Sequence, residues 1–428
     1  MSSFQTALSG LQAASTDLQV MGNNIANAST VGFKQSNAQF ADAYAAAIAG
    51  SAPINGQVGI GTSVSTVAQQ FSQGNIQTTN NPLDVAINGA GFFQFDYNGA
   101  TVYGRNGQFQ LNNQGYIVDG NGAELVGQTA TSGTLTGATG PLQVLANTLA
   151  PSGTSKLALS VNLNASDTPI ASGVAFDPNN TSSYNFSTVS TVYDSLGTSH
   201  LMTTYYSLAS GGTSGAGQVW DVHYSLAGAY DPGSATSGSA SSVFMSSGQS
   251  VSLNFTQGGQ LVTSGSGTGI VASGFAWSDG ASGTAINVSF SGSTNYAASD
   301  GVNSIHADGF GVGQLSNLSI GADGTVQGIY SNGQTWTLGK VSLTNFAAPQ
   351  GLQRAGNNYY VPTAASGQPV TGTPGNNGLG VLQSSAVEES NVDLSTQLVD
   401  LIVAQQAYQA NSQTIKTENQ VVQTLLSL

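Results

Sequence analysis

Apolar residues recur at helical spacing at both ends of the 428-residue chain. Near the C-terminus, two interleaved sets of positions follow the four-three spacing of a coiled-coil seam. The first set is Leu394, Leu401, Tyr408, Ile415 and Val422, and the second is Leu398, Gln405, Ser412, Asn419 and Leu426. The same spacing near the N-terminus joins Phe4, Leu8, Leu11, Ser15, Leu18, Gly22 and Ile25. We therefore expect helices over about residues 2–28 and 392–426 that pack side by side and bring both termini to one end.

Local signals place the ends of these helices. Asn391 or Asp393 can cap the start of the second, and Asn27, Ser29, Thr30 and Gly32 are stop signals for the first. A further short helix is expected over Ala38–Ile48, followed to Gln70 by an extended linker with some strand.

Between the helical ends, short apolar runs alternate with turn residues. Asn-Gly pairs, which favour type I′ hairpin turns, occur at Asn88, Asn98, Asn106 and Asn121. The first expected strands are Leu83–Ile87, Phe92–Tyr97, Phe109–Leu111 and Tyr116–Val118. Those of the second block are Ser187–Tyr193, His200–Leu208, Val219–Leu226, Val251–Phe255 and Ala285–Phe290. The second block fits a β-sandwich or barrel.

These patterns predict a mixed α and β fold: a terminal α-helical coiled-coil pair plus two mainly-β domains, the second inserted in the first. Residues 1–32 and 390–428 form the helical assembly domain, and residues 33–75 form a linker. The first β domain takes in 76–170 and 308–389, and the inserted outer β domain takes in 171–307.

Composition narrows the function classes. Only 6% of residues are charged, and 20 acids against six scattered bases give a net charge of −14, so nucleic-acid binding is disfavoured. No run approaches the roughly 20 apolar residues of a membrane span, and no cleavable signal peptide is recognised. Cysteine is absent, which excludes disulfides and thiolate chemistry. We expect no membrane insertion and no cofactor.

Catalytic and metal-binding motifs are also not found. The chain has three histidines, and it shows no nucleophile elbow, phosphate loop, dinucleotide-binding turn or paired-histidine zinc motif. His200 and His223 fall on expected strands, where a structural histidine is the simplest interpretation, and no third metal ligand is identified. The chain is therefore expected to be neither an enzyme nor a metalloprotein.

The helical ends are instead the candidate site for self-assembly. Ordering some 60 helical residues costs about 90 kcal/mol of conformational entropy, whereas one apolar seam returns only about 20 kcal/mol. We expect neighbouring copies to supply part of the difference, so that the ends order on assembly into a helical homopolymer. The expected assembly seam is Leu8, Leu11, Leu18, Ile25, Leu394, Leu398, Leu401, Tyr408, Ile415 and Val422.

Two long motifs at the chain ends resemble the consensus sequences of bacterial flagellar rod and hook proteins. The N-terminal motif runs from Gly22 to Lys34 and includes Asn23, Asn24, Ile25, Asn27, Gly32 and Phe33. The C-terminal motif runs from Ser390 to Thr417. The segments Asn80–Phe93 and Tyr103–Gly107 are similar to the first β domain of distal rod and hook members. Rod members lack the second block of strands, whereas the segment Val192–Gly197 within that block resembles the outer domain of members that form the hook.

The resemblance implies a structural subunit of the flagellar hook, the curved tube that joins rod to filament and transmits motor torque for motility. It implies an extracellular location on the basal body, after export by the flagellar type III apparatus without a cleaved signal peptide. The implied partners are further copies of the chain, the distal rod protein, the hook-filament junction protein, the hook cap and the export apparatus. The paired helices would line the tube and the inserted domain would face outward.

Three other interpretations stay open at this point. A distal rod or junction protein of the same family is distinguished by whether residues 176–306 fold as a surface domain. An adhesin-like binding module fits the Gly-, Ser- and Thr-rich strands and leaves the terminal helices without a purpose. A carbohydrate-active enzyme requires a cleft with two carboxylates.

Overall fold

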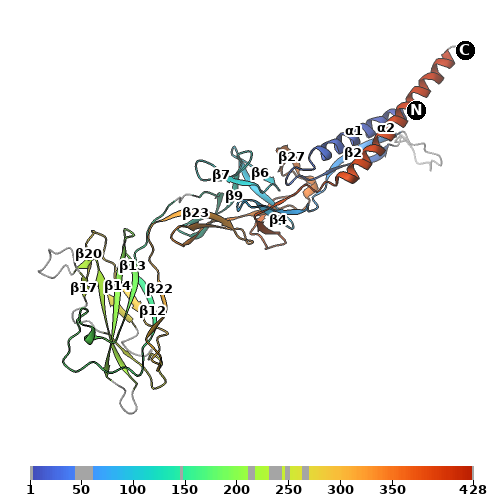
Figure 1. Ribbon diagram of the computed structural model, residues 1–428. Helices are drawn as coiled ribbons and strands as arrows, with labels where there is room; N and C mark the ends of the chain where they lie inside the picture. Colours follow the sequence, from blue (N-terminus) through green and yellow to red (C-terminus); the bar gives the residue numbers. More distant parts are fainter. Residues whose placement is uncertain are drawn as a thin grey trace, which may run out of the picture. The chain divides into compact units, whose positions relative to one another are not determined.

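The computed structural model describes residues 3–43, 61–144, 148–210, 217–230, 243–245, 251–262 and 269–426. The chain divides into two compact units. Unit 1 comprises residues 1–146, 316–329 and 335–428, and unit 2 comprises residues 147–315 and 330–334. Unit 2 is therefore an insertion in unit 1. The expected fold class, terminal helices with mainly-β regions between them, is confirmed (Figure 1).

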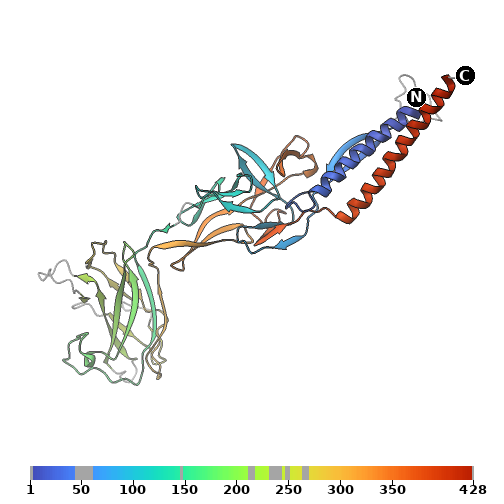
Figure 2. The same cartoon turned by 45° about the horizontal axis from the view of Figure 1, so that its top comes forward.

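Helices α1 (Ser3–Ala26) and α2 (Leu394–Leu426) run side by side in opposite directions, and both chain ends lie at the same end of unit 1 (Figures 1 and 2). Asp393 caps α2, because its Oδ1 accepts hydrogen bonds from the backbone N–H of Ser395 at 2.8 Å and of Thr396 at 3.2 Å. Among the described residues, neither helix is long and apolar enough to span a bilayer.

The helix expected over Ala38–Ile48 is wrong where the structure describes it. Residues 36–43 form strand β1 (Ser36–Ala43), which pairs antiparallel with β2 (Gly61–Gln69), while residues 44–48 lie outside the described residues. Both strands contact α1. At Gly61, where φ is +131°, an added Cβ would lie 2.2 Å from the Ser9 hydroxyl. The alanine-rich sequence favours a helix locally, but strand pairing against α1 overrides that propensity. The expected linker therefore contains a paired β-ribbon.

The β region of unit 1 is dominated by one large antiparallel sheet, in which neighbouring strands follow the order β24-β25-β9-β5-β6-β28-β27. Two smaller strand pairs, β3 with β31 and β4 with β30, each pair a strand that follows α1 in the chain with a strand that precedes α2. The bounds are β3 (Ile76–Thr78), β4 (Val85–Asn88), β5 (Phe92–Tyr97), β6 (Ala100–Gly104), β7 (Phe109–Leu111), β8 (Ile117–Asp119), β9 (Glu124–Thr131), β10 (Thr134–Pro141), β23 (Gly313–Ile320), β24 (Thr325–Tyr330), β25 (Thr335–Val341), β26 (Leu343–Asn345), β27 (Gln353–Gly356), β28 (Tyr359–Val361), β29 (Val370–Gly372), β30 (Val381–Ser384) and β31 (Ala386–Glu388).

The hairpin between β5 and β6 shows how the turn residues position this sheet. Asn98 and Gly99 both have positive φ, at 56° and 82°, as a type I′ turn requires. Gly107 serves a different purpose, because a Cβ there would lie 1.7 Å from the carbonyl oxygen of Val85. This glycine allows close backbone approach and does not form the expected turn with positive φ.

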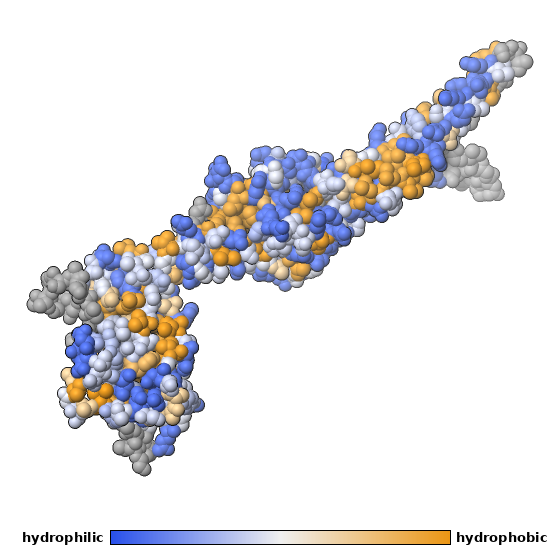
Figure 3. All heavy atoms as spheres, in the orientation of Figure 1, coloured by the Kyte–Doolittle hydropathy of each residue, from blue (hydrophilic) through white to orange (hydrophobic). Residues whose placement is uncertain are grey.

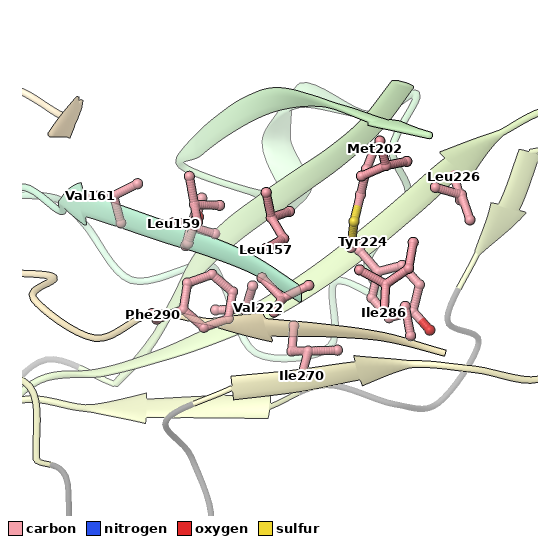
Figure 4. Close-up of a cluster of buried hydrophobic side chains, with 14 of the residues drawn as sticks. Leu157, Leu159, Val161, Met202, Val222, Tyr224, Leu226, Ile270, Ile286 and Phe290 are labelled. Atoms are coloured by element: carbon pink, nitrogen blue, oxygen red, sulfur yellow. The ribbon is translucent and has the colours of Figure 1, made fainter. Parts of the chain in front are cut away.

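Unit 2 is built from two sheets with a common core. A four-stranded sheet has the order β19-β21-β12-β22, and a five-stranded sheet places β14 and β15 at its centre. Their apolar faces share one buried cluster, which takes in Leu159 of β12 and Tyr224 of β15 (Figure 4). The bounds are β11 (Thr148–Leu149), β12 (Lys156–Asn162), β13 (Phe186–Tyr193), β14 (Ser199–Ser210), β15 (Val219–Ala227), β16 (Ala229–Tyr230), β17 (Val243–Met245), β18 (Val251–Asn254), β19 (Gly269–Ala272), β20 (Ala276–Trp277), β21 (Ile286–Ser289) and β22 (Gly301–Ala307).

The boundary of the inserted unit differs from the expectation that it begins at residue 171. Strand β12 pairs with β21 and β22, so it belongs to the sheet of unit 2, and the division falls near residue 147. The alternating pattern of β12 would suit either β region, because one face of each is buried. The long-range partners of the strand decide the boundary.

Candidate assembly site

The contact between α1 and α2 is made largely by small and polar side chains. Gly10 of α1 lies against Asn411 of α2, and a Cβ at Gly10 would come within 2.8 Å of the asparagine oxygen. Asn24, which is 1% exposed, donates to Gln397 Oε1 at 3.0 Å. Buried alanines of the helices are Ala7, Ala13, Ala14 and Ala404. These small residues let the two backbones approach closely.

A patch of apolar residues on α2 is exposed. We call Leu398, Val399, Ile402 and Val403 the outer stripe; their exposed fractions are 51%, 60%, 53% and 58%. At 100° per residue, they lie about 100° to 160° around the helix from the buried Ala404. Figure 3 shows hydrophobic atoms at the surface over this helical end of unit 1. The outer stripe is thus an apolar helix face that no other described residue of the chain covers fully.

The expected seam residues divide into two groups in the structure. Leu11, Leu18, Ile25, Leu401 and Ile415 are half-buried. Leu8, Leu394, Leu398, Tyr408 and Val422 are exposed by 38% to 51%. The second set of the C-terminal pattern is displaced by one residue, because Gln397, Ala404 and Asn411 face α1 where Leu398, Gln405 and Ser412 are expected. Sequence periodicity therefore predicts the two helices, and within one chain half of the expected assembly-seam residues are left exposed.

An acidic cleft opens beside the helix pair. It has a volume of about 250 Å³, and its lining includes Asp17, Asp393 and Asp400. Burial raises the pKa of Asp17, and the nearby Asp400 carboxylate raises it further. Two like charges therefore oppose each other across α1 and α2 at neutral pH.

The N-terminal motif residues attach α1 to the strands that follow it. Asn24 donates to the Ser36 carbonyl at 2.8 Å and accepts from the Ser36 N–H at 3.0 Å. Asn27 donates to the Asn23 carbonyl at 2.9 Å in the last turn of α1. Ile25, the remaining apolar motif residue of the helix, is half-buried. The asparagines satisfy backbone groups where the helix ends.

Gly32 and Phe33 then bring the chain onto the β region. Gly32 has φ of +70°, and a Cβ there would lie 2.6 Å from the backbone nitrogen of Asn106. Its N–H donates to the Glu388 carbonyl at 2.7 Å. Phe33 is 4% exposed, and the Arg354 guanidinium lies 5.3 Å from its ring centroid. Only glycine suits this conformation and this contact without strain.

A buried ionic cluster lies directly beyond these residues. Glu388 Oε1 is 2.6 Å from Lys34 Nζ, and Glu388 Oε2 is 3.2 Å from Arg105 Nη1. Lys34 also donates to the Ser72 carbonyl at 2.7 Å, and Arg105 to the Gly89 carbonyl at 2.9 Å. Burial lowers the pKa values of Lys34 and Arg105, and the Glu388 carboxylate opposes both shifts. We call these three residues the junction triad, because they join the segments that flank both helices to the β sheet.

Sequence reasoning includes Lys34 and Arg105 in separate motifs but does not predict that they meet at one carboxylate. Glu388 lies 354 residues from Lys34 and 283 from Arg105, so no local spacing indicates the pairing. The scarcity of charged residues is the signal that could have indicated a role for these two, since the chain has only six basic residues and two of them lie in motifs beside strands.

Models of flagellar protein families match most of the chain. The flagella basal body rod protein family matches residues 4–34, and the flagellar hook protein FlgE/F/G D1 domain matches 86–165. The flagellar basal body protein FlaE D2 domain matches 162–310, and the flagellar basal body rod FlgEFG protein C-terminal family matches 383–428.

Full-length relatives carry the same description. The chain is 37% identical over 437 residues to the flagellar hook protein FlgE of Salmonella typhimurium, with all of both chains covered. It is 37% identical to that of Escherichia coli, covering 99% of each chain, and 29% identical to that of Treponema pallidum, covering 100% of this chain and 99% of the relative. The crystal structure of the Helicobacter pylori flagellar hook protein FlgE2 matches 73% of this chain and all of its own, with TM-score 0.52 and 14% identity, which shows likeness of fold.

Proposed function

Because the chain belongs to the family of bacterial flagellar hook proteins, its role is that of a structural subunit of the hook, and we propose that the outer stripe of α2 joins neighbouring subunits. One observation carries this proposal: four adjacent apolar side chains are each more than half exposed on the helix face turned away from α1. A soluble chain rarely leaves such a continuous apolar patch uncovered unless another molecule binds there.

The energy available at the outer stripe suits a contact repeated along a polymer. Complete burial of a Val, Leu or Ile side chain contributes about 1.5–3 kcal/mol, and each of these residues is already nearly half covered. Each therefore adds about 1 kcal/mol on assembly. Roughly 4 kcal/mol per subunit is too little for a stable isolated dimer, which needs about 8 kcal/mol even for micromolar affinity. In a polymer, several neighbours supply such contacts together.

We propose a head-to-tail arrangement in which this patch meets a different patch on the next subunit. A heterologous contact of this kind grows an open helical tube, with the paired helices on the inner layer. Weakly charged β surfaces can then slide past one another while the helical layer holds, which would let the tube bend during rotation. The seam residues Leu394, Tyr408 and Val422 are also exposed, but at 100° per residue they lie within about 80° of Ala404 and so on a different face from the outer stripe.

Finer features of the role follow from family membership and are proposals for this chain. We propose export through the flagellar type III apparatus without a cleaved signal peptide, and contacts with the distal rod protein, the hook cap and the hook-filament junction protein. Immunogold electron microscopy with an antibody against residues 176–306 tests the location. Label on a short curved segment between envelope and filament is expected, whereas label along the filament or over the cell surface would contradict it.

Substitution of Ile402 by Asp tests the assembly surface. The change removes about 1 kcal/mol of apolar burial and forces a carboxylate into the contact at a cost of several kcal/mol. Together these raise the critical concentration for polymerisation by roughly 10³-fold. Polymer is measured by sedimentation and negative-stain electron microscopy, and the helical content of the monomer by circular dichroism.

Val370→Asp is the matched control, because Val370 is 61% exposed and lies in β29 of the same unit, outside the helices. Its critical concentration is expected to stay within tenfold of the wild type. Polymerisation of the Ile402 variant at wild-type concentrations would show that the outer stripe is not the joining surface. Family membership and the hook role would stand in that case.

A further inference from the structure

Unit 2 contains a cluster of potential metal ligands that the assembly role does not use. Asp194 follows β13, His200 lies near the start of β14, and Asp279 lies in the loop after β20. One ligand atom from each residue lies within 4.8 Å of the other two. Sequence reasoning leaves His200 without a third ligand, because Asp279 is distant along the chain. The folding of β20 against β16 brings it to the other two.

Two of the ligands are held rigidly. Asp194 is completely buried, and its Oδ1 accepts from the N–H groups of Leu196 at 2.8 Å and Thr198 at 2.9 Å. Its Oδ2 is therefore left to face His200 Nε2 at 2.9 Å. Burial acts to raise the pKa of Asp194, but hydrogen bonds with the side chains of His200 and Asp279 and with these two N–H groups hold that pKa well below its usual range. The carboxylate is thus ionised, and His200 Nε2–H donates to it.

The His200 ring is fixed on two sides. It stacks on Trp277 with ring centroids 3.9 Å apart. Its Nδ1 lies against Gly228, where an added Cβ would come within 2.6 Å of that nitrogen. Nδ1 is thus closed off, and Nε2 is the nitrogen directed at the two carboxylates. Asp279 is exposed, so the cluster is open to solvent on that side and a cation can enter there.

The charge environment gives an independent reason for a cation. Unit 2 carries eight Asp residues and Lys156 as its one basic residue. Within the described residues, neither Asp194 nor Asp279 forms an ion pair with a lysine or arginine. A buried carboxylate is ordinarily paired with a base or bound to a metal. Here a second carboxyl group, that of Asp279, lies beside it, and a cation between the two would take the place of the missing base.

We propose that Asp194, His200 and Asp279 bind one divalent transition-metal cation of the Zn²⁺ type. Imidazole with carboxylate favours such borderline ions over Mg²⁺ and Ca²⁺, which take oxygen ligands. With metal–ligand bonds of about 2.1 Å, the 2.9 Å separation of Nε2 and Oδ2 corresponds to an angle of about 90° at the metal. This angle fits a five- or six-coordinate site completed by water, and a small shift of the exposed Asp279 brings its carboxylate into reach.

Binding has a defined proton balance and a structural effect. The cation takes the Nε2 lone pair of the neutral ring, so the proton that Nε2 donates to Asp194 moves by way of solvent to Nδ1, and no net proton is released. The bound ion ties the turn between β13 and β14 to the loop after β20. These segments belong to different sheets of unit 2, so the ion acts as a cross-link within the unit. The proposal is independent of how subunits assemble.

Isothermal titration of the full-length chain with ZnCl₂, after removal of metals by chelation and with light scattering to confirm monomer, tests the site. One Zn²⁺ per chain is expected. Asp279→Asn is expected to weaken binding at least tenfold. It leaves the fold intact because the side chain is exposed. His306→Gln is the control, since His306 is an exposed histidine of the same unit, and it is expected to bind as the wild type does.

Three results would overturn the proposal: the absence of stoichiometric Zn²⁺ binding, equal affinity in the Asp279 variant and the wild type, or loss of binding in the His306 variant. Displacement of Zn²⁺ by equimolar Mg²⁺ or Ca²⁺ would also overturn it, because that result indicates general attraction of cations to an acidic surface. Circular dichroism of each variant shows that the fold is retained.

Discussion

The junction triad makes a quantitative prediction about Glu388. Replacement by Gln keeps the size of the side chain and removes the negative charge between Lys34 and Arg105, which are 0% and 4% exposed. The amide oxygen of Gln can still accept from one of the two cations, but its NH2 group faces the other, whose remaining acceptor is the carbonyl of Ser72 or of Gly89. Removing one partner of a buried ion pair costs about 3–5 kcal/mol. At 1.36 kcal/mol per factor of ten, the equilibrium constant for local opening of the chain around the junction triad rises roughly 150- to 5,000-fold.

Hydrogen exchange followed by mass spectrometry measures this change where it occurs. The N–H groups of Gly32 and Gly74 donate to the carbonyl and the carboxylate of Glu388, at 2.7 and 2.9 Å. Their protection is expected to fall by that factor in Glu388→Gln. Asp323→Asn is the control, because the Asp323–Lys340 pair is partly solvent-exposed, and such pairs contribute under about 1 kcal/mol. Equal, small losses of protection in both variants would refute the argument for the triad.

A triple variant separates charge from packing. Replacing Lys34 by Met, Arg105 by Leu and Glu388 by Leu removes all three charges and keeps most of the volume. Hydrophobic replacement of a buried ionic cluster is often neutral or stabilising, so protection is expected to return to within tenfold of the wild type. A triple variant as unprotected as Glu388→Gln would place the stabilisation in the hydrogen bonds to Ser72, Gly74 and Gly89.

Three further outcomes are expected. Gly32→Ala adds a methyl group 2.6 Å from the Asn106 nitrogen at φ of +70°, and should cost at least about 1–3 kcal/mol in denaturant unfolding of unit 1. Asp17→Asn removes the repulsion between residue 17 and Asp400 and should raise the thermal midpoint of the helix pair slightly. Because folding raises the pKa of Asp17, this gain in thermal midpoint should be present at neutral pH and disappear as the pH falls below the pKa of Asp17 in the folded chain. The pKa of Asp194 is lowered on folding, so the ionised carboxylate stabilises unit 2 above about pH 4, and this stabilisation is lost as the pH falls. Acid unfolding followed by tryptophan fluorescence should show that loss in the wild type and not in Asp194→Asn.

The sequence predicts those parts of the fold that local pattern determines. The helices end within a few residues of the expected bounds because apolar period, caps and stop residues agree. The strand Phe92–Tyr97 and its Asn98-Gly99 turn follow from alternation and from the positive φ that Asn and Gly tolerate. The division between two β regions likewise follows from the long Gly-, Ser- and Thr-rich middle.

Features that depend on contacts between distant segments are not predictable in this way. The contact between α1 and α2 includes Ala404 and Asn411, where close approach of the backbones favours small residues, whereas the expected leucine positions are divided between half-buried and exposed residues. Strand β1 is alanine-rich, and pairing with β2 overrides its helical propensity. Glu388 meets Lys34 across 354 residues. In each case the deciding partner lies far away in the sequence.

The placement of charge in unit 1 bears on how a hook subunit can stay intact while its contacts with neighbours change. Lys34, Arg105 and Arg354, half of the chain's basic residues, lie at the junction between the helices and the β sheet. Hydrogen-bonded ionic contacts are directional, and partial displacement exposes a buried charge at a cost of several kcal/mol. Apolar contacts, such as those proposed for the outer stripe, are non-directional, and displacement changes their energy in proportion to area. We therefore propose that a polymer that bends deforms first at its apolar subunit contacts, while the junction triad keeps helices and sheet together within each subunit.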